Sequence, residues 1–188
     1  MIEMYERSLA RTETVVAGVD RERFSDPTPC DDWDVEKLLD HIIGGCLTFA
    51  GGGSGEPVDA MQERGFSTKD HVAAYQEAAA SALETFRAPG ALEGTLTLPW
   101  GDTPGPTALG LALADSAVHG WDLAVATGQK LEIDEDIAEA IYAMTSSMMA
   151  PKGDFPRMTA FKDPIEVDDE APAQVRMLAY LGRRAPAS

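Results

Sequence analysis

The sequence is poor in basic residues and contains no long apolar run. Its 188 residues include 15 Lys and Arg against 32 Asp and Glu, which gives a formal net charge of −17. Such a surface repels the phosphates of nucleic acids and of anionic lipid headgroups, so neither is an expected partner. No window approaches the roughly 20 apolar residues that span a bilayer, and the first residues lack the basic start and apolar stretch of a signal peptide. These absences predict a cytoplasmic protein.

Cysteine is also scarce. The two cysteines, Cys30 and Cys46, form no CxxC pair. Because no export signal is present, we expect no disulfide, and each cysteine should be a small side chain in or near the core. Hydrophobic residues at 44% and charged residues at 25% are typical of a globular protein. A chain of this length fits one domain, so we expect a single domain over residues 1–188.

Apolar residues recur at helical spacing in several segments, so the predicted fold class is all-α. In the segment that begins at Asp134, the residues expected to fill the core include Met144 and Met148 as well as Ile137 and Ile141. The predicted helices span residues 3–19, about 34–50, 67–88, 106–127, 134–150 and 173–181.

The starts of two helices and two of the connections have sequence signals of their own. One helix should begin at an acidic N-cap, Asp32 or Asp34, and another with a capping box at residues 67–70. Residues 94–100 alternate weakly and predict a short extended piece or a hairpin. The glycine run at 51–55 lacks the Lys-Ser or Lys-Thr of a phosphate-binding loop and no strand precedes it, so we expect a flexible loop there.

Three ionisable residues share one face of the helix predicted at 106–127. At 100° per residue, His119 lies about 40° from Asp115, and Asp122 lies about 20° on the other side of Asp115. The preceding turns are apolar almost all round, so this helix should be buried, and a buried carboxylate without a partner costs several kcal/mol. The helix has no Lys or Arg before Lys130. A divalent metal ion would supply the missing positive charge, because an acid and a histidine one turn apart can both bind it.

Other interpretations of these residues stay open. Asp115 and His119 could form a hydrogen-bonded pair, or contact an arginine from another helix. His41 lies at the edge of its helix's apolar face, and Gly44 and Gly45 leave room beside its ring, but a partly exposed histidine has the same pattern. His71 falls in the first turn of a helix, where the helix dipole disfavours a cation, so it is left out of the site.

Two motifs resemble one known family. Pro27-Thr28-Pro29-Cys30, with Trp33 and then His41, is similar to that family's "PTPC-x-x-W" entry into a helix that carries a ligand histidine. Residues 115–122 resemble its "acid-x-x-x-His-x-Trp-Asp" helix, and residues 168–183 resemble the end of its single-domain members. The chain thus resembles, over nearly its whole length, the DinB-like superfamily that includes the N-terminal domain of mycothiol-dependent maleylpyruvate isomerase.

The resemblance implies an up-and-down four-helix bundle with a metal ion, usually zinc and sometimes nickel, near one end of its core. Carried over position by position, the protein ligands would be His41, Asp115 and His119. Three ligands leave a position at which a thiol could be activated. That thiol would come from a small molecule such as mycothiol, because neither cysteine is expected on the ligand face. Asp122 could orient a ligand imidazole or pair with an arginine, and the arginine is slightly favoured.

Two departures from the family limit the functional prediction. The isomerase uses glutamate where this sequence has Asp115, and it has a further C-terminal domain for which this sequence is too short. Maleylpyruvate isomerisation is therefore not the expected reaction. The leading hypothesis is a metal- and thiol-dependent S-transferase or isomerase that acts on a small electrophile. The alternatives are a non-catalytic metal- or ligand-binding module and a bundle without metal. The methionine pair at 148 and 149 suggests a homodimer.

Overall fold

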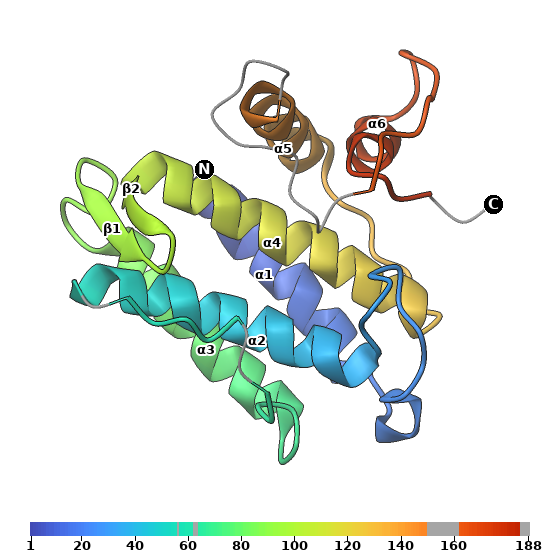
Figure 1. The fold of residues 1–188 in the computed structure, drawn as a ribbon, viewed down its shortest axis with the longest axis horizontal. Coiled ribbons are helices and arrows are strands. Elements are labelled where there is room, and N and C mark those ends of the chain that lie inside the picture. Colours follow the sequence, from blue (N-terminus) through green and yellow to red (C-terminus); the bar gives the residue numbers. More distant parts are fainter. Residues whose placement is uncertain (56, 62–63, 150–161, 185–188) are drawn as a thin grey trace. The chain divides into compact units, whose positions relative to one another are not determined.

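The computed structural model covers the 188 residues of the chain, and the residues it describes are 1–55, 57–61, 64–149 and 162–184. These residues are mostly helical, with six α-helices and one antiparallel two-stranded sheet (Figure 1). Contacts divide the chain into two compact units, Met1–Leu131 and Glu132–Ser188. The first holds α1 (Ile2–Ala17), α2 (Val35–Gly51), α3 (His71–Arg87), β1 (Thr95–Leu98), β2 (Gly101–Pro104) and α4 (Gly105–Ala126). The second holds α5 (Glu135–Met148) and α6 (Ala173–Tyr180). The mostly helical class is therefore confirmed.

Side-chain caps decide where two of these helices begin. The Asp34 side chain accepts a hydrogen bond from the backbone N–H of Lys37 and begins α2, which confirms one of the two predicted caps. In α3 the Asp70 side chain accepts from the N–H of Ala73, so the helix begins at His71. The predicted capping box at 67–70 is therefore wrong: Asp70 is itself the N-cap, and a residue cannot cap the helix and also lie in its first turn.

Helices α1 to α4 enclose the core of the first unit. Both α1 and α2 pack against α3 and α4, so the four apolar faces meet (Figure 1). Burying a Leu, Ile or Phe side chain in such a core stabilises the fold by about 1.5–3 kcal/mol. The largest fully buried side chains of the four helices are Tyr5, Leu38, Leu39, Ile42, Ile43, Tyr75, Phe86, Leu109, Leu113 and Leu123.

Small residues bring α1 and α4 close together. A Cβ at Gly120 would lie 2.3 Å from Thr12 Oγ1, so only glycine allows this approach. The Thr12 hydroxyl donates to the Ser116 carbonyl at 3.1 Å, and the Ser8 hydroxyl donates to the Ser116 hydroxyl at 3.0 Å. These contacts fix the rotation of α4 about its axis, and that rotation sets the direction in which Asp115 and its neighbours point.

The hairpin predicted near 94–100 is present. β1 pairs with β2 in antiparallel register, from Thr95 opposite Pro104 to Leu98 opposite Gly101. Gly101 has a φ of 116°, which favours glycine at this turn. Alternate residues Leu96 and Leu98 are buried, which explains the weak alternation in the sequence.

The second unit has a small core of its own between α5 and α6. The ring of Tyr142 meets the ring of Tyr180 edge to face, with centroids 5.5 Å apart. Ile137 and Ile141 are buried as predicted, whereas Met144 and Met148 are only half-buried and contribute less to the core than expected. The predicted end of this helix at 150–151 lies outside the described residues. None of the helices in the described ranges is both long and apolar enough to cross a membrane.

Arg23 ties the loop before α2 to the end of α4. Its guanidinium donates to the carbonyls of Thr127 and Ala126 at 2.6 and 3.2 Å, and to Asp26 at 2.8 Å. A cation at a helix C-terminus also interacts favourably with the helix dipole. We expect Arg23→Ala to lower the free energy of unfolding by about 1 kcal/mol in urea titrations.

The matched control is Arg87→Ala, which removes an exposed ion pair with Glu6. Exposed pairs contribute little, so this variant should lose less than about 0.5 kcal/mol. Equal losses in the two variants would contradict a specific role for Arg23 at the end of α4.

Candidate metal centre

His41 lies in the second turn of α2, and its ring is almost completely buried, with 8% of the residue exposed. Its Nε2 is 3.3 Å from Asp115 Oδ1 on α4, and its Nδ1 is 3.4 Å from the carbonyl oxygen of Met61. The partly exposed position considered from the sequence is therefore wrong. Packing of α2 on α4, together with the segment that carries Met61, covers a ring that helical spacing placed at the core's edge.

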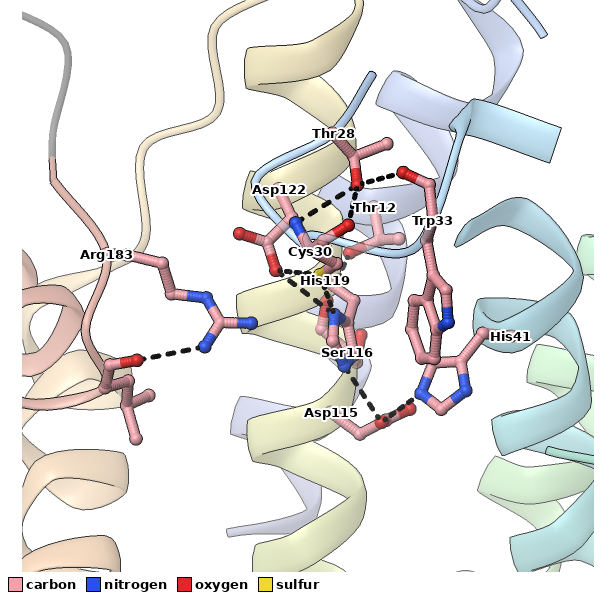
Figure 2. A network of polar contacts seen from close by, with 11 residues as sticks. Thr12, Thr28, Cys30, Trp33, His41, Asp115, Ser116, His119, Asp122 and Arg183 are labelled. Carbon is pink, nitrogen blue, oxygen red and sulfur yellow. Dashed lines mark hydrogen bonds and ion pairs between the residues drawn. The ribbon is translucent and has the colours of Figure 1, made fainter. Parts of the chain in front are cut away.

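His119 is arranged in the same way on α4. Its Nε2 is 3.7 Å from Asp115 Oδ1, and its Nδ1 is 3.1 Å from Asp122 Oδ2. One ligand atom from each of His41, Asp115 and His119 lies within 4.8 Å of the others. The structure thus brings together the three residues predicted to bind metal (Figure 2).

The two imidazoles share a feature that suits metal ligands. Each places Nδ1 against an oxygen acceptor, which favours the tautomer with the proton on that nitrogen. In that neutral tautomer, each ring would present an unprotonated Nε2 to a cation bound beside the Asp115 carboxylate. Two imidazole nitrogens and one carboxylate oxygen are donors that suit zinc or nickel, and a three-residue set leaves room for a further ligand.

The pKa values follow from the closeness of these groups. Burial lowers the pKa of His41, but the hydrogen bond and charge of Asp115 outweigh it and hold that pKa above its ordinary value. Burial raises the pKa of the Asp115 carboxyl, but the hydrogen bond and charge of His41, with the charge of His119, bring it below its ordinary value. Without a metal, His41 and Asp115 therefore tend toward an ion pair, and a bound cation would compete with the His41 proton.

Gly45 lets Asp115 reach this position. A Cβ at Gly45 would lie 2.5 Å from Asp115 Oδ2, whereas a Cβ at Gly44 would lie 2.2 Å from the backbone oxygen of Ala60. The two glycines were expected to leave room beside the His41 ring. Instead, the carboxylate occupies one space and the chain after α2 occupies the other, because α4 and this segment both pack tightly on α2.

Asp122 is fully buried and contacts the His119 ring at Nδ1. The structure therefore places Asp122 where it can orient the His119 imidazole, which was the less favoured of the two roles considered from the sequence. One helical turn separates the two residues, which is close enough for this contact when the imidazole turns its Nδ1 edge toward the carboxylate.

Cys30 lies beside a predicted ligand, which the sequence did not indicate. Its Sγ is 3.3 Å from Asp122 Oδ2 and 3.8 Å from His119 Nδ1, on the opposite side of the ring from Asp115. The expectation that both cysteines lie away from the ligand residues is therefore wrong for Cys30. Helical periodicity cannot place it, because it belongs to the loop before α2.

Trp33 contributes more than packing. Its ring centroid is 4.4 Å from that of His41 and 5.8 Å from that of His119, so the indole lies against both imidazoles. Trp121 is 4% exposed, so its side chain packs in the core.

Asp40 and His71 are buried outside the cluster. Asp40, to which no sequence pattern pointed, accepts hydrogen bonds from the N–H groups of Gly65 and Ser67 at 2.7 and 2.8 Å and fixes the chain before α3. His71 packs edge to face on Phe24, and neither of its ring nitrogens has a hydrogen-bond partner among the described residues. It lies outside the three-residue cluster, as predicted.

The second cysteine, Cys46, is expected to be chemically inert. Burial raises the pKa of its thiol to about 12. The thiolate is the reactive form, so at about pH 8 iodoacetamide should leave the buried Cys46 unlabelled in the folded protein. Peptide mass spectrometry checks this, and both cysteines should react in denaturant. Labelling of Cys46 in the folded protein would contradict the prediction.

The fold and the cluster define a helical protein with a buried His–Asp–His group. The chain belongs to the mycothiol maleylpyruvate isomerase N-terminal domain family, whose model matches residues 5–124, and the predicted family is thereby confirmed. The chain is also 32% identical over 179 residues to uncharacterized proteins from two strains of Mycobacterium tuberculosis, with 95% of each chain covered. No solved structure matches the chain significantly.

Proposed function

We propose that this protein binds one divalent metal ion, zinc or alternatively nickel, through His41, Asp115 and His119. The observation that carries the proposal is the shared arrangement of the two imidazoles. Each directs Nδ1 to an oxygen acceptor and Nε2 to the same carboxylate oxygen of Asp115. The proposal includes a DinB-like up-and-down four-helix bundle formed by α1 to α4, with the metal ligands on α2 and α4.

The proposed activity is transfer of a small-molecule thiol, mycothiol or a similar compound, to a small electrophile, or a thiol-dependent isomerisation. When bound, the metal would lower the pKa of a coordinated thiol and supply a thiolate at neutral pH. Asp115, His41 and His119 would hold the metal. Trp33 covers both imidazole rings and limits the access of water. Membership of a mycothiol-related family supports the choice of thiol.

Elemental analysis and a turnover assay test the proposal in sequence. Protein purified without chelator should contain about one zinc or nickel ion per chain. Metal-loaded protein should then consume a test electrophile, such as a chloronitrobenzene, only when mycothiol or another small thiol is added. His41→Ala should lose both the metal and the turnover, and Arg87→Ala, which is distant in sequence and exposed, should keep both.

The remaining outcomes separate the alternatives. Metal without turnover for any thiol and electrophile would favour a non-catalytic metal-binding module. Protein without metal that also fails to bind added Zn²⁺ or Ni²⁺ would leave the His41–Asp115 ion pair as the role of the cluster and overturn the proposal. A cytoplasmic location and a homodimer are also part of the proposal, and light scattering of the purified protein tests the dimer.

A further inference from the structure

The loop before α2 carries a polar contact that the proposed metal binding leaves unexplained. Cys30 Sγ donates to Asp122 Oδ2 at 3.3 Å, and the same oxygen lies 3.1 Å from His119 Nδ1. Asp122 Oδ2 thus accepts hydrogen bonds from both the Cys30 thiol and the His119 Nδ1–H. Figure 2 shows the resulting line of contacts from Cys30 through Asp122 and His119 to Asp115 and His41.

The loop holds Cys30 firmly in this place. The Thr28 hydroxyl accepts a hydrogen bond from the Cys30 N–H at 3.1 Å and donates to the Trp33 carbonyl at 2.8 Å. The Trp33 N–H in turn donates to the Cys30 carbonyl at 2.9 Å. This small turn places both the Cys30 thiol and the Trp33 ring against His119, so a single loop contacts that imidazole at two points.

Two other roles for Cys30 agree less well with the geometry. Cys30, His119 and Asp122 also bring one ligand atom each within 4.8 Å of the others. As a ligand of the proposed centre beside His41 and Asp115, however, Cys30 would have to lie on the Nε2 edge of His119, but its sulfur lies on the Nδ1 edge. As a nucleophile it would need to be a thiolate, and a thiolate 3.3 Å from the Asp122 carboxylate would be repelled. A protonated thiol that donates to the carboxylate satisfies both groups.

We propose that Cys30 is a positioning residue for the metal centre, acting through Asp122. Its thiol fixes the orientation of the Asp122 carboxylate, and the carboxylate fixes the tautomer and orientation of the His119 ring. The inference rests on the proposed metal binding. Partners of this kind behind a ligand histidine are worth about 10- to 100-fold in metal affinity, so the loss on removing the more distant Cys30 should be near the lower value.

Co²⁺ titration of the full chain tests the role. Cys30→Ala should weaken Co²⁺ binding about 10-fold. Cys30→Ser keeps a donor and should recover most of the affinity. In an Asp122→Ala protein, the added change Cys30→Ala should have no further effect, because Cys30 acts only through that carboxylate. Urea titration of the metal-free variants shows which of them are folded at the temperature of the Co²⁺ titration. Co²⁺ affinities are compared only among the folded variants.

The Co²⁺ spectrum separates the possible failures. A strong near-ultraviolet thiolate-to-cobalt band that disappears in Cys30→Ser would show that Cys30 is a ligand, and this would overturn the inference. Equal affinities of the wild type and Cys30→Ala, or additive losses with Asp122→Ala, would also overturn it. Absence of Co²⁺ and Zn²⁺ binding in the wild-type protein would instead refute the proposed function itself, so the two failures are distinguishable.

Discussion

Replacement of His119 by alanine should reduce the affinity for Zn²⁺ or Ni²⁺ by more than about 100-fold, because even outer partners of a ligand histidine are worth 10- to 100-fold. The change removes an Nε2 donor that faces Asp115 and also removes the imidazole that contacts the buried Asp122. Competition with a chromogenic chelator measures the affinity. The matched control is His71→Ala, which removes a buried histidine outside the cluster and should leave the affinity of the folded protein unchanged.

The role of His119 can also be tested by removing the metal and measuring the unfolding temperature. A ligand that binds only the folded state at 1,000 times its dissociation constant stabilises that state by about 4 kcal/mol. Chelator should therefore lower the unfolding temperature of the wild type and leave that of His119→Ala almost unchanged. If both proteins respond equally to chelator, or if His71→Ala loses affinity as strongly as His119→Ala, the assignment of the site is wrong.

The variants Gly45→Ala and Gly44→Ala should have different defects: the first in metal binding and the second in stability. The new methyl at Gly45 would meet the end of the Asp115 side chain, 2.5 Å away, and a side chain can rotate aside. The fold should survive, but the displaced carboxylate should weaken metal binding by about 10-fold or more. The methyl at Gly44 would meet the Ala60 backbone oxygen at 2.2 Å, which cannot move alone. That variant should lose about 1–3 kcal/mol of stability.

Urea titration of the metal-free proteins and a metal-binding isotherm for each separate these effects. We expect the folded Gly44→Ala protein to bind metal with nearly the wild-type affinity. Loss of metal binding without loss of stability in Gly44→Ala, or unchanged binding in Gly45→Ala, would show that Asp115 is not the carboxylate ligand that its position beside α2 indicates.

The helices were the part of the fold that could be predicted best from the sequence. The spacing of apolar residues indicated every α-helix in the described ranges, and Asp34 marked the start of α2 correctly. These features depend on neighbours within a few residues, since 3.6 residues make a turn and a cap acts over three. The error at the start of α3 also concerns near neighbours. Ser67 and Asp70 are both residue types that cap helices, and Asp70 is the one that caps α3.

The site was only partly accessible from the sequence. Spacing placed Asp115, His119 and Asp122 on one face of α4, and the family resemblance added His41. Neither indicated that Cys30 would lie against Asp122 or that a backbone carbonyl would lie beside His41. Loop residues have no period that reveals which way they point, and a backbone carbonyl has no sequence signature.

The sequence by itself therefore determined the helices, their boundaries within a few residues and the shared face of α4. Only the tertiary structure decided what faces that helix from elsewhere in the chain. His41 and Asp115 are 74 residues apart, and Cys30 and Asp122 are 92 residues apart. The physical reason is that helix formation depends on contacts between near neighbours, whereas the groups that surround Asp115 and His119 are chosen by the packing of α1, α2 and the Cys30 loop on α4.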